Sequence, residues 1–242
     1  MKPLFLQPII SNEENIFSLS ISDLMTALLL VFILILSGIS LKLAKQQEEN
    51  RERLDMISVQ EEAKRRIIAQ LKGERDQFDI EVDQKTGAIR IKEGVLYEFG
   101  RSELNEKDKQ FLNKFIPRYA KILFARTEIR EQIGQVIIEG HTDNIGKYLP
   151  NMKLSMDRAY NVVHYVYSEE FTDFDYKNIL RKKLSADGRS FVNPISENDT
   201  IEGRGRNRRV EFKFSFKDWT TLQSEQFNNR GDNGYSKKPA QF

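Results

Sequence analysis

The chain has 242 residues, a length that allows one ordinary domain with an added segment or two small domains. Its 38 Lys and Arg residues nearly balance 36 Asp and Glu residues, and the net charge of +2 argues against a nucleic-acid partner, because phosphate binding needs a concentrated excess of cations. Cysteine is absent, which excludes disulfides and thiolate metal sites, and two histidines are too few for a His-rich metal site. The sequence therefore predicts neither a metal nor a cofactor.

The most apolar segment is "SISDLMTALLLVFILILSGIS", Ser20 to Ser40. Residues 24–41 carry no charge, and these 18 residues would rise roughly 27 Å as a helix, close to the thickness of a bilayer's hydrocarbon core. A cleaved signal peptide is a poor interpretation, because the preceding residues include Glu13 and Glu14 rather than a basic cluster. We predict one transmembrane helix over residues 20–42, preceded by a short N-terminal segment, residues 1–19.

The orientation of this helix is ambiguous from the flanking charges. Lys42 and Lys45 follow the apolar run, whereas only Lys2 and the α-amine precede it. Taken alone, the positive-inside rule would place the C-terminal side in the cytoplasm.

Asp23 lies near the start of the apolar run. A carboxylate within a membrane costs free energy and is by default a candidate for function. Alternatively, Asp23 lies at the membrane interface, where water solvates it.

Residues 43–78 are rich in Gln, Glu, Lys, Arg and Leu and contain no proline, which predicts a charged helical stalk. Its apolar positions are compatible with pairing to a second copy of the chain, or with a solvated helix that has one apolar side. The heptads are too broken to predict a coiled coil.

From residue 79 the pattern predicts an α+β domain over residues 79–217, with helices on one face of a mixed sheet. "FDIEVDQKTGAIRIKEGVLYEF" reads as a hairpin, and "QVIIEGHTD" and "NRRVEFKFSF" read as further strands. "NEKDKQFLNKFIPRYAKILFA" has helical spacing with Asn105 as its N-cap, and "NMKLSMDRAYNVVHYVYSE" is a second amphipathic helix. The order is β-β-α-β-α-(α)-β, followed by a polar tail, residues 218–242, that we predict to be disordered.

Asp143 ends the "EGHTD" strand, and Arg158 lies early in the following helix. Such a pair can be a plain salt bridge. It can also hold a zwitterion, with the carboxylate taking a ligand ammonium and the guanidinium a ligand carboxylate. The sequence predicts no catalytic residue: His141 is the only candidate base, and a structural role at the strand end suits it better.

"IIEGHTDNIG…N..LS..RA..V" followed by "NRRVEF" resembles the C-terminal peptidoglycan-binding domain of the outer-membrane protein A family. The resemblance implies that Asp143 and Arg158 grip the ammonium and carboxylate of diaminopimelate in the stem peptide of the cell wall. The other residues that it implies for this pocket are Thr142, Asn151, Leu154, Asn207 and Arg208. The sequence departs from the family at "LSADGRSFVNPI", where a G-x-G element is usual.

A wall-binding domain implies that residues 79–217 are periplasmic and the N-terminus is cytoplasmic, in the bacterial inner membrane, which overrides Lys42 and Lys45. The whole plan resembles stator B subunits such as MotB of the flagellar motor, in which two B chains sit inside a pentameric ring of multispanning A chains and an Asp carries H⁺ or Na⁺. That role falls on Asp23, with the hydroxyls of Ser22 and Thr26 close enough to help coordinate an ion.

"SISDLMTALLLVFILIL" is similar to the B subunit of the Zorya anti-phage system more than to flagellar subunits, which carry an aromatic-Ala-Asp-Phe-Met opening. This resemblance implies an ion-driven motor subunit in anti-phage defence that is not an enzyme. The alternatives are a flagellar stator subunit and a passive tether between membrane and wall.

Overall fold

The computed structural model describes residues 12–218, 220–222 and 224. The chain divides into two compact units, Met1–Asp55 and Met56–Phe242. Part of the predicted segment 1–19 and most of the predicted tail 218–242 lie outside the described residues, so the prediction of a disordered tail stays a prediction.

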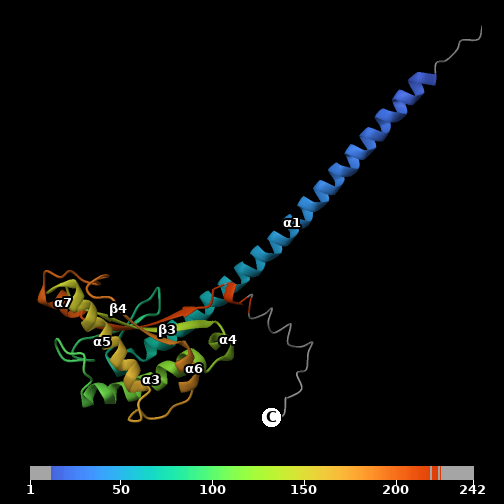
Figure 1. Ribbon diagram of the computed structural model, residues 1–242. Coiled ribbons are helices and arrows are strands. Elements are labelled where there is room, and N and C mark those ends of the chain that lie inside the picture. Colours follow the sequence, from blue (N-terminus) through green and yellow to red (C-terminus); the bar gives the residue numbers. More distant parts are fainter. Residues whose placement is uncertain (1–11, 219, 223, 225–242) are drawn as a thin grey trace, which may run out of the picture. The chain divides into compact units, whose positions relative to one another are not determined.

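A single helix, α1 (Asn12–Gly73), accounts for the described part of the first unit and continues into the second (Figure 1). Within the described residues it is the one helix long and apolar enough to cross a membrane, with a mean hydropathy of 2.7 over its most apolar window. None of that window is buried against the other residues that the structure describes. A helix that is apolar on all sides needs a non-aqueous surrounding, which lipid or the apolar surface of another protein supplies.

The last turns of α1 belong to the core of the second unit. Ala63, Ile67 and Leu71 are buried among the residues of the sheet domain. The packed domain therefore begins before residue 79, inside the segment that the sequence predicts as stalk. Because the apolar side chains recur three to four residues apart, they form one helical stripe, and this stripe covers the core rather than facing solvent.

The second unit contains a five-stranded sheet in the order β1-β2-β5-β3-β4. Its strands are β1 (Glu81–Val82), β2 (Ile89–Lys92), β3 (Ile133–His141), β4 (Leu184–Gly188) and β5 (Arg209–Phe216). β3 and β4 are parallel, and the other neighbouring pairs are antiparallel. This mixed sheet confirms the predicted α+β class.

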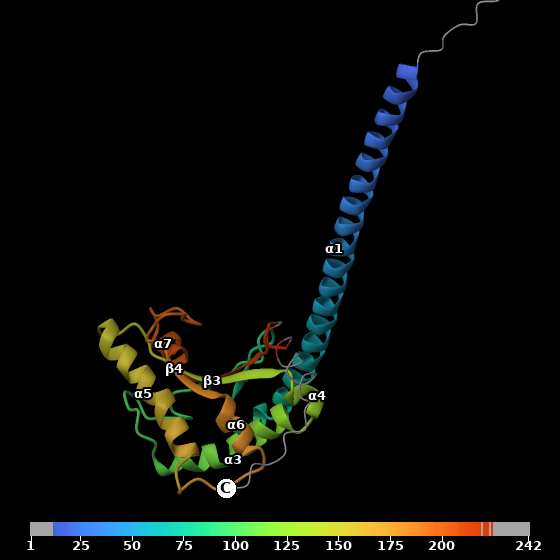
Figure 2. The same cartoon turned by 45° about the vertical axis from the view of Figure 1, so that its right-hand side comes forward.

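The helices of the second unit are α2 (Arg75–Phe78), α3 (Glu106–Phe124), α4 (Thr127–Arg130), α5 (Tyr148–Val166), α6 (Lys177–Lys183) and α7 (Ile201–Asn207). α3, α5 and α6 lie on the same side of the sheet in both views (Figures 1 and 2). Asn105 caps α3 as predicted, and it forms a reciprocal capping box with Asp108.

β4 is absent from the order that the sequence predicts. It comes from "LSADG", the segment that departs from the usual family pattern, and its side chains are mostly half-buried. Because β4 is an edge strand of small and polar residues, it lacks the apolar alternation that identifies a strand in sequence.

The two faces of the sheet differ in chemistry. Ile138, Val210 and Phe212 are buried in the apolar core. Glu139 and Glu211, one position along, are Cα partners across β3 and β5 and point to the opposite face. The residues that the family resemblance implies for the pocket lie near the point where strands β2 and β3 end and β5 begins.

Candidate functional site

The approach of α5 to β3 depends on a glycine. A Cβ on Gly140 would lie 2.0 Å from the carbonyl oxygen of Ser155, so only glycine lets the helix come this close to the strand. Ser155 is fully buried, and its Oγ accepts a hydrogen bond from the backbone N–H of Ser190 at 2.9 Å. This contact places Arg158, three residues further along α5, beside the ends of the strands.

A pocket of about 420 Å³ opens at this position. It brings together six of the seven residues that the family resemblance implies: Thr142, Asp143, Asn151, Leu154, Arg158 and Arg208. Its remaining lining residues are Glu93, Phe99, Gly100, Ile145, Ile201 and Arg204. Residues that directly follow β3, residues of α5 and the residue that precedes β5 therefore meet in one pocket, although they are far apart in sequence.

Four charged side chains form a continuous chain of ion pairs in the pocket wall. Arg158 Nη2 lies 2.5 Å from Glu93 Oε1, and Arg208 Nε donates to Glu93 Oε2. Arg208 Nη1 then lies 2.6 Å from Asp143 Oδ2. Burial acts to lower the pKa of Arg208, but hydrogen bonds to Asp143 and Glu93 outweigh it and raise that pKa above its ordinary value.

Asp143 and Arg158 therefore line the same pocket, but each is paired with another residue. Asp143 pairs with Arg208 and also accepts a hydrogen bond from the backbone N–H of Ile145 at 3.0 Å. Arg158, only 1% exposed, pairs with Glu93 and donates from Nε to the carbonyl oxygen of Arg101 at 2.8 Å. Asp143 and Arg158 therefore do not face each other as one pair. Glu93 and Arg208 lie between them and complete a chain of alternating charges.

Glu93 is the residue that sequence reasoning missed. It directly follows β2, and its side chain is only 6% exposed. The sequence placed it in the second half of a hairpin, where a glutamate is ordinary. The available signal was that the hairpin strand ends in a carboxylate while the "NRR" strand begins with guanidinium groups, so pairing of the two strands brings opposite charges together.

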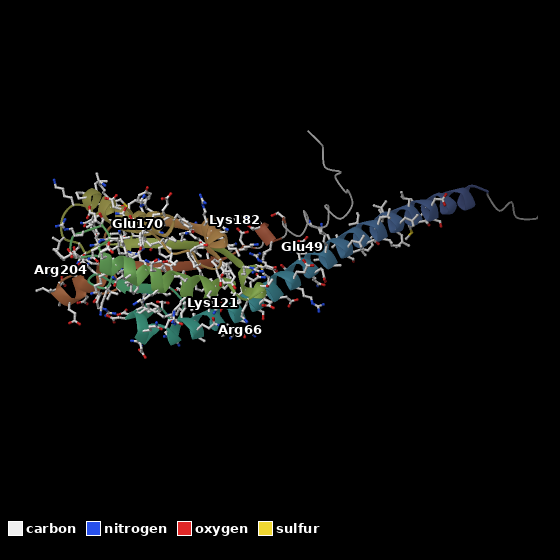
Figure 3. The ribbon with its side chains drawn as sticks, turned by 90° about the horizontal axis from the view of Figure 1, so that it is seen from below. Glu49, Arg66, Lys121, Glu170, Lys182 and Arg204 are labelled. Carbon is white, nitrogen blue, oxygen red and sulfur yellow. The ribbon has the colours of Figure 1, made fainter. Side chains whose placement is uncertain are left out.

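The rim of the pocket is apolar and exposed. Phe99, Ile145 and Ile201 line the pocket and are 74%, 64% and 79% exposed. The guanidinium carbon of Arg208 lies 4.8 Å from the centre of the Phe99 ring, which is within cation–π distance. Arg204 projects from α7 at one end of the domain (Figure 3). The pocket thus offers charges at its base and apolar surface around its opening.

Asn207 does not line the pocket, although the resemblance assigns it there. It is fully buried, and its side chain holds the loop before α7: Oδ1 accepts from the backbone N–H groups of Ile195 and Ser196, and Nδ2 donates to Ser196 O and Asn198 Oδ1. Its role in the structure is to fix this loop and, with it, the start of β5.

Asn151 and Thr142 contribute to the pocket in different ways. Asn151 Nδ2 donates to the carbonyl oxygens of Ile145 and Lys147, which holds the loop that carries Ile145 of the rim. Thr142 is 4% exposed, and its Oγ1 makes no hydrogen bond within the described chain. A buried hydroxyl without a partner is costly unless a ligand or water satisfies it. Thr142 is therefore suited to contact a ligand.

The candidate ion-carrying residues lie in the first unit, on α1. Asp23 is exposed, as are Ser22 and Thr26. Thr26 Oγ1 donates its proton to the carbonyl oxygen of Ser22 at 2.8 Å. The oxygen of Thr26 keeps its lone pairs for a cation, whereas its proton is used within the helix.

A second charged cluster occupies the sheet face opposite the core. Glu139, His141 and Glu211 have ligand atoms close enough together for a metal ion. However, Lys213 Nζ lies 2.5 Å from Glu139 Oε1, and Arg209 Nε lies 2.6 Å from Glu211 Oε1. Because cations of the chain already neutralise both carboxylates, we interpret the cluster as an ion-pair network that stabilises the sheet.

This network predicts a loss of stability in acid. Burial acts to raise the pKa of Glu139, but His141 and Lys213 outweigh it and lower that pKa from 4.5 to about 2. Burial lowers the pKa of His141 below 6.5. Both groups bind protons more readily when unfolded, so their stabilisation is full above these ordinary values and is lost as the pH falls, first below 6.5 and then between 4.5 and about 2.

Thermal unfolding of the full chain in detergent, measured over this pH range, should show the fall in Tm. In Glu139→Gln, Tm should be lower at neutral pH but change less between pH 4.5 and about 2. Glu169→Gln, at an exposed position, is the control and should keep the wild-type slope. An unchanged slope in Glu139→Gln would contradict the assignment.

The chain is similar to several known proteins. Residues 96–208 match the OmpA family. The chain is 34% identical over 222 residues to the Zorya protein ZorB of Escherichia coli strain Crooks, covering 84% of this chain and 88% of that protein. It is 34% identical over 119 residues to outer membrane protein A of Bordetella avium, covering 49% and 53% of the two chains. The solved cell wall anchor of the T6SS from Pseudomonas aeruginosa is 25% identical, with a TM-score of 0.45, and covers 64% of this chain and 99% of that one.

The fold and the site define an OmpA-type domain joined to a long apolar helix at its N-terminal side. Within this class, the similarity to the Escherichia coli protein extends over both parts, the helix and the domain. The chain belongs to the ZorB family.

Proposed function

We propose that the chain is the B subunit of an ion-driven, stator-type motor in the bacterial inner membrane, which it anchors to peptidoglycan and which acts in anti-phage defence. The N-terminus is cytoplasmic, α1 crosses the membrane, and the OmpA-type domain is periplasmic. Membership of the ZorB family supports the class of protein. The single observation that carries wall binding is the pocket that combines Asp143, Arg158, Glu93 and Arg208.

The chemistry of this pocket suits a zwitterionic ligand. Asp143 can accept the ammonium of a diaminopimelate residue while Arg158 donates to its carboxylate, and each contact is a charge-assisted hydrogen bond. Thr142 Oγ1, which is buried and makes no hydrogen bond to any residue that the structure describes, can take a third polar group of the ligand. The exposed rim side chains of Phe99, Ile145 and Ile201 can contact the methyl groups of neighbouring alanines in a stem peptide.

Asp143→Asn tests wall binding. The substitution keeps the size of the side chain but removes the charge that holds the ligand ammonium, so affinity for purified peptidoglycan should fall about tenfold or more. The full chain in detergent is sedimented with isolated sacculi, and the bound fraction is measured over a range of salt concentrations. Asp173→Asn, in which an exposed carboxylate is lost, serves as the charge-matched control and should bind like wild type. Equal binding by Asp143→Asn would remove the pocket from the proposal.

The motor part of the proposal rests on Asp23. A carboxylate in an apolar helix is costly when charged and much less so when protonated, so a cycle of protonation and release can move the helix between polar and apolar surroundings. The same carboxylate, with the oxygens of Ser22 and Thr26, can instead coordinate Na⁺. The apolar, exposed surface of α1 between residues 24 and 41 is the surface that a multispanning A subunit would cover.

The proposed assembly contains two copies of this chain within a pentameric ring of A subunits. The proposal gives the chain no catalytic role. Its wall-binding part and its ion-carrying part lie in separate units and can be tested by separate substitutions.

A further inference from the structure

Glu93 forms ion pairs with Arg158 and Arg208, whose guanidinium groups a ligand carboxylate would need. We infer that Glu93 is an internal competitor for the ligand's carboxylate and so sets which form of the wall peptide the pocket prefers; this inference rests on the proposed wall binding. Neither the family resemblance nor the comparisons assign a role to this residue.

The contacts of Glu93 indicate that it competes directly with a ligand carboxylate for the two arginines. Its two oxygens each engage a different guanidinium, Oε1 that of Arg158 and Oε2 that of Arg208. Oε1 also accepts from the backbone N–H of Gly100 at 3.3 Å. The side chain is only 6% exposed, so these contacts are shielded from water and correspondingly strong. The carboxylate of a bound ligand would form the same kind of charge-assisted hydrogen bonds with an arginine as Glu93 does.

One edge of the Arg158 guanidinium group cannot form full hydrogen bonds with two carboxylates. Its Nε is used by the carbonyl oxygen of Arg101, and its Nη2 by Glu93. A ligand carboxylate must therefore displace Glu93 from Arg158 or approach beside it, where two negative charges repel. Arg208 would remain held by Asp143 and by the ring of Phe99 if Glu93 moved. The ion pair between Glu93 and Arg158 is therefore the contact that a ligand carboxylate must break or weaken.

This competition distinguishes two forms of the ligand. A diaminopimelate residue with a free side-chain carboxylate competes with Glu93, whereas its carboxamide brings no second negative charge and leaves Glu93 in place. Loss of the charge at position 93 should therefore help the free acid and not the amide. A residue that only positions Arg158 would instead weaken the binding of both forms when altered.

The test uses the full chain in detergent and isothermal titration with two probes. The first is the tetrapeptide L-Ala–γ-D-Glu–meso-diaminopimelate–D-Ala, and the second is the same peptide amidated on the side-chain carboxylate of diaminopimelate. In Glu93→Gln we expect affinity for the free acid to rise about tenfold, the factor that one lost charge-assisted contact represents, and affinity for the amide to stay within about twofold. Glu103→Gln removes a charge from an exposed position in the following loop and should leave both affinities unchanged.

Folding is checked by the Tm of each variant without ligand. If Glu93→Gln does not fold, Glu93→Asp replaces it, since the shorter side chain keeps the charge but draws away from Arg158; it should shift the preference in the same direction by a smaller factor. Weaker binding of both peptides by the substituted chain, or an unchanged preference, overturns the inference while wall binding stands. If the wild-type chain binds neither peptide nor sacculi, the proposed wall binding fails and the inference fails with it.

Discussion

Asp23→Asn should abolish anti-phage protection while the protein still accumulates in the membrane and still binds peptidoglycan. Asparagine has nearly the same size but cannot release or accept a proton at neutral pH, and it is a poorer ligand for Na⁺ than a carboxylate. The substitution therefore stops an ion cycle without removing a packing contact within the chain, because Asp23 is exposed in the structure. The measurement is the plating efficiency of phage on cells that carry the complete native operon.

The control for this prediction is Asp55→Asn, which removes an exposed carboxylate from the same helix outside the apolar run. Plating efficiency on Asp23→Asn cells should equal that on cells without the operon, whereas Asp55→Asn cells should resist like wild type. Membrane abundance and sedimentation with sacculi are compared for all three chains. Full protection by Asp23→Asn would make Asp23 an interfacial residue and favour a passive tether.

Arg158→Met should both destabilise the domain and abolish wall binding. Arg158 is 1% exposed, and its loss leaves the buried carboxylate of Glu93 without one guanidinium and the carbonyl oxygen of Arg101 without its donor. Breaking a buried ion pair on one side costs about 3 kcal/mol, which corresponds to a fall in Tm of roughly 6–12 °C for a domain of this size. Thermal unfolding of the full chain in detergent measures it.

Arg118→Met is the matched surface substitution. Arg118 is half exposed, and it pairs with Glu74 at 2.9 Å, so its loss should cost less than about 1 kcal/mol and leave binding to sacculi unchanged. Binding by both variants is compared at a temperature well below their transitions, so that unfolding does not imitate a loss of affinity. An unchanged Tm for Arg158→Met would show that the ion-pair chain contributes little to stability.

The candidate wall-binding residues could be named from sequence because they lie in short motifs that resemble those of the outer-membrane protein A family. Local periodicity predicts the strand that Asp143 follows and the helix that carries Arg158, whereas the family resemblance implies their role. Asn207 shows the limit of such motifs. It belongs to the same "NRR" element as Arg208, but its side chain turns to the loop at Ile195 and Ser196 instead of to the pocket.

The pairing within the pocket could not be predicted in the same way. Glu93 and Arg208 are 115 positions apart, and only the register of β2 against β5 brings them together. The extent of the packed domain was also hidden, because Ile67 and Leu71 lie in a charged helical segment that resembles a solvated stalk. β4 was hidden because an edge strand does not need an apolar face.

The amino-acid sequence by itself determined the features that depend on neighbouring residues: an 18-residue uncharged run directly after Asp23, the cap at Asn105, and the alternation in β2, β3 and β5. These follow from local hydrogen bonding and from the periods of helices and strands. Only the tertiary structure decided that Arg158 pairs with Glu93 and Asp143 with Arg208. The physical reason is that a charged side chain has many possible partners of opposite sign along the chain. Strand register, together with the close approach of α5 to β3 at Gly140, decides which of them lie within reach.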